Sequence, residues 1–448
     1  LLDEDMEYYS TDFRRSMTEY LKKRKKQRPV RLQICGNISE KGMTIIRKRI
    51  SLEERSVFCS KMPFETNFGG YLKKKAFKSE KQTPVNSSEL KRGEYLSYLE
   101  KRDILLSFPY QSIEPFIDVL YEAADCPDTE EIKITLYRLA KKSRIAEALK
   151  YAAQNGKKVL CLLELRARFD EQNNIDYSEE LEKAGCKVIY GLPNYKVHSK
   201  ICLITINRNG RKNFVTQIGT GNYNEVTCEN YCDLSLITSD EEIGKDAEMI
   251  FSSLENGEIP PLTQKLWAAP LGYKKKVLEL LDEESRKGSE GYAAIKVNSL
   301  NDMDVMQKIS EASCAGVKIE LFVRGICCIK PGIEGLTENV SVKSVVGRHL
   351  EHSRIFIFGK GENSHIFVGS GDLLNRNTRR RVEIFAPIEK DEIREQVEEV
   401  MNAFRDDDVK GRLMHSNGRY YKSKKPKGED SQQRLRRYFA DKSISEKI

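Results

Sequence analysis

The chain has 448 residues, of which 39% are hydrophobic and 32% are charged. This length is enough for about three domains with buried cores, and the composition is typical of a globular protein rather than a disordered one. No apolar run approaches the roughly 18 residues that a membrane-spanning helix requires, and the first residues lack the pattern of a secretory signal peptide. The net charge of +8 permits an anionic partner (nucleic acid, phosphate or anionic lipid) but selects none of them.

The eleven cysteines have neither the pattern of a disulfide framework nor that of a zinc site. Their number is odd, their spacing is irregular, and Cys327 and Cys328 are adjacent. No Cys-x-x-Cys pair is present to suggest a zinc site. We therefore expect reduced thiols in a cytoplasmic protein.

The first part of the chain has the pattern of a small mixed module. Apolar residues at helical spacing predict a helix over 11–27, and alternation predicts a strand over 30–35. Ser39 is suited to cap a second helix that continues to Arg49. A basic stretch over 71–94 is expected to be a linker. Residues 1–95 are therefore predicted to form one domain, a small α/β head.

From about residue 105 the pattern alternates between strands and helices, and it does so twice. The first series has a helix over 144–155 that ends at Gly156, and the second has a helix over 305–315 that ends at Gly316. The expected strands are 132–137, 159–163, 187–190 and 201–204 in the first series, and 295–300, 319–323, 355–358 and 365–368 in the second. Such alternation predicts an α/β (α+β) fold with mixed sheets flanked by helices. We expect two similar domains, at 96–270 and 271–448.

A short polar motif occurs once in each of these two halves. His198-Ser-Lys200 is followed by the turn Gly219-Thr-Gly-Asn222, and His352-Ser-Arg354 is followed by Gly369-Ser-Gly-Asp372. If each motif lies in a strand, the histidine and the cation two residues later point to the same face. The repetition therefore predicts one active site that both halves build.

These residue types suit phosphoryl transfer through a histidine. A neutral imidazole can attack phosphorus, and the ordinary pKa of histidine already lies near neutrality. Nearby cations lower that pKa further and stabilise charge on the transferred group. We expect His198 to be the nucleophile, and His352 to act as a general acid or to stabilise the leaving oxygen. His349, His365 and His415 are expected to be structural or exposed.

Arginines follow several of the expected strands, at the sheet edge where ligands bind in such folds. Arg138, Arg166 and Arg168 follow strands of the first half, and Arg324 follows the matching strand of the second. Guanidinium groups bind phosphate through paired hydrogen bonds. Together they predict a phosphate cradle.

The duplicated His-x-(Lys/Arg) motif with its glycine turns resembles the layout of the phospholipase D superfamily, although Thr205 stands where that superfamily usually has Asp. A more specific resemblance is to the polyphosphate kinase family, whose catalytic core is phospholipase D-like. It runs from about Asp103 to about Arg412 and weakly into 1–95. The motifs that carry it are Thr135-Leu-Tyr-Arg138, Glu164-Leu-Arg-Ala-Arg-Phe-Asp170, Asn222-Tyr-Asn224, Asn230-Tyr-Cys-Asp233, Val323-Arg-Gly-Ile-Cys327, Leu350-Glu-His-Ser-Arg354, Arg376-Asn377 and Arg381-Val-Glu383.

The resemblance implies a role for several individual residues. His198 resembles the phosphorylated histidine and His352 the second essential histidine, near the nucleotide phosphates. Tyr231 and Arg324 match nucleotide-contacting positions. Arg138 and Arg168 match positions that the family assigns to magnesium. Because a guanidinium cannot ligate a cation, we interpret these two as holding phosphates that carry Mg²⁺.

The resemblance also implies an activity and its partners. The expected reaction is the reversible transfer of the ATP γ-phosphate to the end of inorganic polyphosphate, through a phosphohistidine, with Mg²⁺ and ATP/ADP. Polyphosphate is expected to run along a basic tunnel between the halves. We expect a cytoplasmic homo-oligomer without a nucleic-acid partner and leave a peripheral membrane association open. The chain does not begin with Met, and the helical domain that usually begins the family is expected to be missing from it.

Two alternatives remain open at the level of sequence. One is a phospholipase D-like phosphodiesterase that acts on lipid or nucleic acid. The other is a non-catalytic fragment that binds polyphosphate or another polyanion. Release of alcohol or nucleotide from a diester would favour the first, and binding without phosphoenzyme formation would favour the second.

Overall fold

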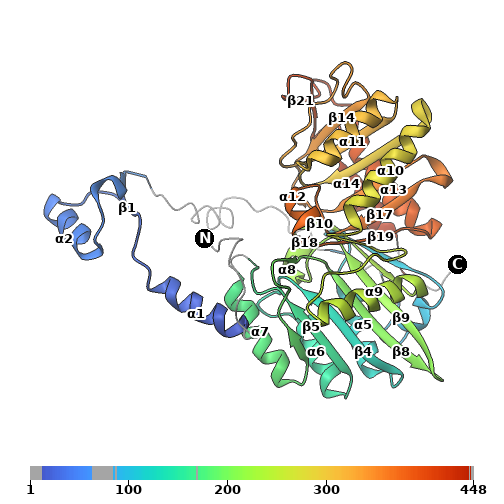
Figure 1. Ribbon diagram of the computed structural model, residues 1–448, viewed down its shortest axis with the longest axis horizontal. Coiled ribbons are helices and arrows are strands. Elements are labelled where there is room, and N and C mark those ends of the chain that lie inside the picture. The colour runs from blue at the N-terminus through green and yellow to red at the C-terminus, as the bar shows by residue number, and fades with distance from the viewer. Residues whose placement is uncertain (1–12, 63–83, 86–87, 168–169, 443, 445–448) are drawn as a thin grey trace. The chain divides into compact units, whose positions relative to one another are not determined.

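The computed structural model describes residues 13–62, 84–85, 88–167, 170–442 and 444 (Figure 1). The chain divides into two compact units, one of them Ser10–Thr83 and the other containing Pro84–Ile448. None of the helices within the described ranges is long and apolar enough to cross a membrane.

The smaller unit is built around a β-α-β arrangement. Strands β1 (Leu32–Cys35) and β2 (Val57–Ser60) pair in parallel, and helix α2 (Glu40–Ile50) connects them. Ser39 caps this helix as predicted, since its hydroxyl accepts a hydrogen bond from the Gly42 amide at 3.1 Å. Helix α1 (Phe13–Lys25) precedes the unit's strands.

The first lobe of the larger unit, residues 95–255, contains a mixed sheet with the strand order β15-β10-β9-β8-β4-β5-β6. Strands β4, β5 and β6 are parallel, whereas β8 and β9 are antiparallel to their neighbours and β3 pairs with β10. The strands of this lobe are β3 (Ile104–Phe108), β4 (Thr129–Leu136), β5 (Lys158–Leu163), β6 (Lys187–Ile189), β7 (Lys196–Val197), β8 (Ile201–Arg208), β9 (Arg211–Gly219) and β10 (Tyr231–Thr238). Its helices are α4 (Tyr95–Leu99), α5 (Glu114–Asp125), α6 (Arg144–Gln154), α7 (Glu171–Lys183), α8 (Glu225–Cys228) and α9 (Glu241–Glu255).

The second lobe, residues 267–441, repeats this plan with the strand order β11-β19-β17-β16-β12-β13-β14-β20-β21. Its strands are β11 (Trp267–Ala268), β12 (Tyr292–Val297), β13 (Lys318–Val323), β14 (Val340–Val345), β15 (Leu350–Glu351), β16 (Arg354–Phe358), β17 (His365–Gly369), β18 (Arg381–Val382), β19 (Ile384–Pro387), β20 (Gly411–Met414) and β21 (Tyr420–Lys422). Its helices are α10 (Tyr273–Arg286), α11 (Met303–Cys314), α12 (Asn375–Arg379), α13 (Asp391–Asp406) and α14 (Ser431–Asp441). The predicted α/β class, with two lobes of mixed sheet flanked by helices and a small α/β unit before them, is confirmed.

The two lobes exchange short strands with each other. Strand β15 belongs to the second lobe by sequence but pairs in parallel with β10 of the first lobe. Conversely, β7 of the first lobe pairs in parallel with β18 of the second. Each exchanged strand immediately precedes one of the two motif histidines. The backbone of each histidine is therefore tied to the other lobe.

Three apolar clusters hold the larger unit together. In the first lobe, α5 and α6 pack through Phe116 and Leu149 on one face of the sheet. In the second lobe, α10 and α11 pack in the same way through Val277 and Ile309 (Figure 1). The third cluster contains side chains of both sheets and of α9, α13 and α14. Since burial of apolar area is the main stabilising contribution, this shared core fixes the lobes against each other.

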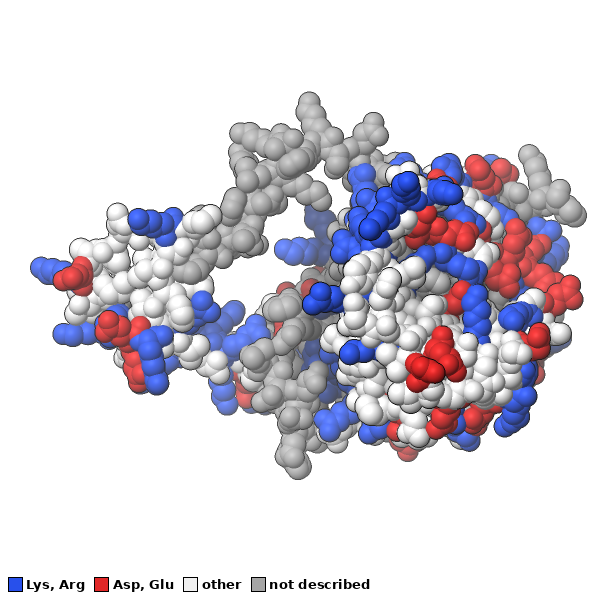
Figure 2. All heavy atoms as spheres, turned by 90° about the horizontal axis from the view of Figure 1, so that it is seen from above, with Lys and Arg blue, Asp and Glu red and all other residues white. Residues whose placement is uncertain are grey.

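Charge is mixed on the face of the molecule that Figure 2 presents. Figure 2 shows Lys and Arg side chains interspersed with Asp and Glu on the face that it presents. On this face the modest net charge is thus distributed, and specific anion binding has to come from local arrangements of side chains.

One premise of the sequence interpretation is wrong. His198 and Lys200 do not share a strand, since β7 ends at Val197 and β8 begins at Ile201. His352 likewise lies between β15 and β16. At His352 the chain leaves β15, which pairs with the first lobe's sheet, and enters the second lobe's sheet. At His198 it leaves the separate two-stranded β7–β18 sheet and enters the first lobe's sheet. The histidines therefore occupy crossing segments, which bring them to the junction of the lobes.

Candidate active site

Both motif histidines are anchored by backbone hydrogen bonds to the opposite lobe. The His198 amide donates to the Val382 carbonyl at 3.0 Å, and the His352 amide donates to the Cys232 carbonyl at 3.1 Å. The residue after each acceptor is a carboxylate, Glu383 or Asp233. The exchanged strands thus deliver an acid from one lobe to the histidine of the other.

Glu383 orients the His198 ring. Its carboxylate oxygens lie 2.9 and 3.0 Å from His198 Nδ1, and its side chain is fully buried. A carboxylate accepts hydrogen bonds, so Nδ1 carries the hydrogen and Nε2 keeps its lone pair. The ring edge also meets Tyr137, with 4.9 Å between ring centroids at 84°. The His198 ring is thus held in one orientation with a nucleophilic nitrogen exposed to the site.

Asp233 orients the His352 ring in the same way. Both Asp233 carboxylate oxygens lie 2.9 Å from His352 Nδ1. Tyr231 packs edge-on against the His352 ring, with 5.4 Å between centroids. The two histidine–carboxylate pairs are related by the duplication, and each pair contains one residue from each lobe.

The two glycine turns hold the carboxylates. Thr220 donates to Asp233 at 2.6 Å, and Ser370 donates to Glu383 at 2.5 Å. Glycine is needed at the next position of the first turn, because a Cβ on Gly221 would lie 2.2 Å from an Asp233 oxygen. The turns therefore orient the acids directly.

Burial and nearby cations lower the pKa of both imidazoles, and that of His198 more strongly. Burial lowers the pKa of His198 well below its usual value, and the charges of Lys200, Arg381 and Arg354 lower it further. Burial and Arg354 also lower the pKa of His352, which Asp233 partly offsets. An unprotonated His198 is the form that can attack phosphorus.

The two motif cations differ in their partners. Arg354 forms an ion pair with Asp372 at 3.2 Å. Burial lowers the Arg354 pKa, but the nearby carboxylates of Asp372 and Asp233 outweigh it and leave the pKa above its usual value. At the equivalent position of the first turn the chain has Asn222, so Lys200 lacks the corresponding acid. The pKa of Lys200 is lowered to about 7 by burial, with Arg354 and Arg381 adding to the effect against Glu383. The site thus contains a buried lysine that a phosphate would stabilise in its charged form.

The two predicted nucleotide contacts lie beside His352. Tyr231 packs on its ring, and half-buried Arg324 donates through Nε to Asn298 at 2.6 Å and to the Glu351 carbonyl. Arg138 lies on the His198 side, next to Tyr137, and forms an ion pair with Asp170 at 2.9 Å. Arg168, predicted to act with Arg138, lies outside the described residues.

Arg166 does not belong to a phosphate cradle. Its side chain is 11% exposed and forms an ion pair with Glu164 at 2.9 Å. It also donates to the carbonyls of Leu192 and Tyr195, while Glu164 accepts from the Val197 amide at 2.8 Å. Arg166 and Glu164 therefore fix the segment that leads to His198. The sequence pattern misassigned Arg166, because an arginine that ends a strand can serve either purpose.

The described side chains do not form a magnesium site. Within the described ranges there is no group of three or more His, Cys, Asp or Glu that could hold a metal ion. The site carboxylates are already engaged: Glu383 and Asp233 by histidines, and Asp372 by Arg354. Mg²⁺ prefers several oxygen ligands in an octahedral arrangement, which this donor set does not offer.

Sequence reasoning assigned no role to Glu383 and Asp233, although both stand in quoted motifs. They lie 185 and 119 residues from the histidines they contact. A signal was nevertheless available, since each acid follows its glycine turn by the same interval. The pairing across lobes was not visible, because the exchange of strands is a tertiary feature.

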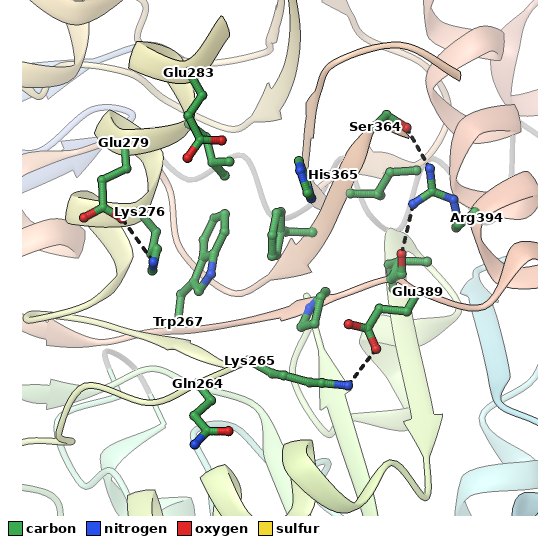
Figure 3. A pocket seen from close by; sticks show the side chains of 15 residues that line it. Gln264, Lys265, Trp267, Lys276, Glu279, Glu283, Ser364, His365, Glu389 and Arg394 are labelled. Atoms are coloured by element: carbon green, nitrogen blue, oxygen red, sulfur yellow. Dashed lines mark hydrogen bonds and ion pairs between the residues drawn. The ribbon is translucent and has the colours of Figure 1, made fainter. Parts of the chain in front are cut away.

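A cavity of about 270 Å³ lies apart from the two histidines, between α10, β17 and the segment that joins the lobes. Figure 3 shows the ion pairs that line it: Lys276 with Glu279, and Lys265 with Glu389. Arg394 donates to Ser364 at 2.8 Å across the same cavity. These cations are already paired, so the cavity serves as part of the lobe junction.

Lys265 joins the lobes through three carboxylates. It contacts Asp240 at 2.8 Å and Glu242 at 3.2 Å in the first lobe, and Glu389 at 2.8 Å in the second. Lys265→Met would leave these acids without their shared cation, so we expect a loss of about 2 to 3 kcal/mol in the free energy of unfolding, measured with urea. Lys276→Met, which removes a half-exposed pair of the same cavity, should cost less than about 0.5 kcal/mol. Equal losses of unfolding free energy in the two variants would contradict the role of Lys265 in joining the lobes.

Two lobes, each supplying a histidine to the other's carboxylate around buried cations, define a duplicated α/β protein with a histidine-centred site. Two family models match the chain: Polyphosphate kinase C-terminal domain 1 over residues 94–259 and Polyphosphate kinase C-terminal domain 2 over residues 266–434. The chain belongs to the polyphosphate kinase family.

Curated relatives and a solved structure agree with this assignment. The chain is 40% identical over 412 residues to the polyphosphate kinase of Staphylococcus epidermidis, a match that covers 90% of this chain and 56% of that protein. It is 38% identical over 421 residues to the polyphosphate kinase of Bacillus cereus, covering 92% and 60%. The crystal structure of the Porphyromonas gingivalis polyphosphate kinase matches with a TM-score of 0.78 and 28% identity, covering 92% and 64%. The chain therefore spans somewhat more than half the length of these relatives.

Proposed function

We propose that this chain transfers the γ-phosphate of ATP reversibly to the end of inorganic polyphosphate, through a phosphohistidine at His198. The observation that carries the proposal is the His198 ring, whose Nδ1 is fixed by Glu383 while Nε2 keeps its lone pair. Membership of the polyphosphate kinase family supports the choice of substrates.

In the first step, His198 Nε2 attacks the γ-phosphorus of ATP. The new N–P bond forms while the bond from phosphorus to the β,γ-bridging oxygen breaks, and ADP leaves with that electron pair. The Nδ1 hydrogen stays shared with Glu383, which balances positive charge on the phosphorylated ring. Lys200 and Arg354 are positioned to stabilise negative charge on the transferred group.

In the second step, a terminal oxygen of polyphosphate attacks the same phosphorus. The N–P bond breaks and the electron pair returns to His198 Nε2, so that the chain is one phosphate longer. For the first step, His352, held by Asp233, is assigned to the leaving oxygen of ADP, to which its imidazolium form gives a hydrogen bond or a proton from Nε2. Tyr231 and Arg324 beside it are assigned to the nucleotide. Reversal of both steps makes ATP from ADP and polyphosphate.

The remaining expectations are kept as parts of this proposal. Mg²⁺ is assigned to the substrate phosphates, with Arg138 and Arg168 holding those phosphates, and no step depends on it here. Polyphosphate binding along a basic path between the lobes should weaken as salt rises. We also propose that the chain has three domains, at 1–95, 96–270 and 271–448. It is expected to form a homo-oligomer and to bind no nucleic acid, and a peripheral membrane association is left open. A cytoplasmic location is supported by the cysteines, all of which are free thiols.

The test is incubation of the chain with γ-labelled ATP and magnesium, followed by mapping of the label. We expect acid-labile, base-stable label on His198 that chases into polyphosphate, together with ATP/ADP exchange. Release of alcohol or nucleotide from a diester would instead support a phosphodiesterase. Retained polyphosphate binding with neither label nor exchange would show a non-catalytic fragment.

The pH dependence of the reaction tests the role of Lys200. Because its pKa is lowered to about 7, its positive charge is lost as pH rises through that value. The kcat/KM for ATP should therefore fall above about pH 7, approaching tenfold for each pH unit. In Lys200→Arg the cation stays charged, so the decline should move beyond the measured range of pH 6 to 9. An unchanged alkaline decline in that variant would exclude Lys200 as its source.

A further inference from the structure

We infer that the C-terminal helix α14 takes part in building the active site, and that Gln432 is a positioning residue for the His352–Asp233 pair. The inference rests on the function proposed above for His352. Gln432 lies in the first turn of α14, far in sequence from both members of the pair, and is 6% exposed.

The Gln432 side chain bridges β15 and the start of β10, the two strands beside this pair. Its amide nitrogen donates to the Glu351 carboxylate at 2.6 Å and lies 3.6 Å from Cys232 Sγ. Glu351 is the residue before His352, and Cys232 is the residue before Asp233. These two residues also face each other in the β10–β15 pairing. Gln432 thus contacts the immediate neighbour of each member of the pair.

The same amide group fixes the segment that enters β15. Gln432 Oε1 accepts from the His349 amide at 3.0 Å, and Nε2 donates to the His349 carbonyl at 2.9 Å. The chain approaches so closely that a Cβ on Gly347 would lie 2.4 Å from Gln432 Oε1. Gly347 therefore permits a contact that a larger residue would displace.

A buried ion pair continues this network past His352. Glu351 also contacts Lys296 at 3.2 Å, and both side chains are 4% exposed. Lys296 donates to the Ser353 hydroxyl at 2.7 Å. Residues 351 and 353, on either side of His352, are thereby tied to one hydrogen-bonded cluster. A buried network of this kind restricts the conformations of the segment that carries His352.

The first lobe fixes its own histidine segment differently. There Glu164 and Arg166, which follow a strand of the same lobe, bind the backbone before His198. At the position of the second lobe that corresponds to Glu164 the chain has Arg324, which is assigned to the nucleotide. Arg324 also donates to the Glu351 carbonyl just before His352, and the second lobe binds this backbone in addition through Gln432 of α14.

The experiment compares Gln432→Met with Gln433→Met. Methionine keeps the length of glutamine and removes its hydrogen bonds, and Gln433 is the exposed neighbour on the same helix. We expect Gln432→Met to lower kcat for phosphoenzyme formation by about 10- to 100-fold, since a displacement of about 1 Å is enough for such a loss. The KM for ATP should change less than about threefold, because the substrate contacts remain. Gln433→Met should match the unchanged protein.

A double-variant cycle separates positioning from general damage to the fold. If Gln432 acts through His352, then adding Gln432→Met to His352→Ala should lower the residual single-turnover rate less than about twofold. A full additional loss, or a Gln432→Met rate equal to that of Gln433→Met, would overturn the inference. Absence of phosphoenzyme in the unchanged protein would instead reject the proposed function. Thermal unfolding of each variant shows whether any loss reflects unfolding.

Discussion

Replacing His198 with Gln is expected to abolish labelling of the protein by γ-labelled ATP and to lower polyphosphate elongation by at least about 10,000-fold. Removal of a nucleophile has effects of this size, because the remaining groups can only assist a reaction that no longer has its first step. Glutamine preserves a hydrogen-bonding side chain near Glu383, so the fold should be retained. The measurement is quantitative labelling combined with a chain-elongation assay.

His415→Gln is the matched control for this variant. His415 lies far along the chain and packs against Tyr421, with 4.5 Å between ring centroids, and no role in the reaction is assigned to it. Its replacement should leave labelling unchanged. A His198→Gln protein that still extends polyphosphate at a normal rate would refute the phosphohistidine at that residue.

The second large effect is expected for Glu383→Gln. The amide can donate to Nδ1, which would move the ring hydrogen to Nε2 and remove the nucleophilic lone pair. Changing the acid that orients a catalytic histidine to its amide has lowered turnover by about 10,000-fold in the serine proteases, and we expect a loss of about 1,000- to 10,000-fold in labelling rate here. Rapid-quench measurement of phosphoenzyme formation gives this rate directly.

Asp233→Asn makes the corresponding change at the other histidine. Because His352 is assigned to the leaving oxygen rather than to the attack, its disorientation should cost about 100-fold. The two variants therefore assign roles to the two pairs. If Asp233→Asn slowed labelling more than Glu383→Gln, the roles of His198 and His352 would have to be exchanged.

Much of the fold follows from local pattern. The helices predicted at 144–155 and 305–315 are observed as Arg144–Gln154 and Met303–Cys314. In both, the glycine that follows adopts positive φ, at 81° for Gly156 and 98° for Gly316. Helix ends of this kind are encoded by a few adjacent residues.

The antiparallel strands of the first lobe were harder to predict. Strand β9 begins with Arg211, Lys212 and Asn213, and the pattern of burial becomes continuous only after them. Strand β10 combines a polar beginning with a buried end, because it contributes Tyr231 and Asp233 to the site. Residues selected for chemistry interrupt the alternation on which strand prediction depends.

The repeated motif was enough to locate the candidate site, but it did not predict which residues pair within the site. Duplication pointed to His198 and His352 with no structural information. Their acid partners, the mixed roles of Arg166 and Arg324, and the contribution of Gln432 depend on which chain segments cross between lobes. Those crossings involve two-residue strands, such as Lys196–Val197, which are too short to carry a periodic signal.

Because the lobes exchange these short strands, each histidine–carboxylate pair depends on both lobes. Either lobe on its own would keep its histidine but lose the carboxylate that fixes the tautomer of the ring. Any ligand or substitution that rotates one lobe against the other would therefore disturb the orientation of both His198 and His352. The contacts between the lobes therefore bear on both histidine–carboxylate pairs at once.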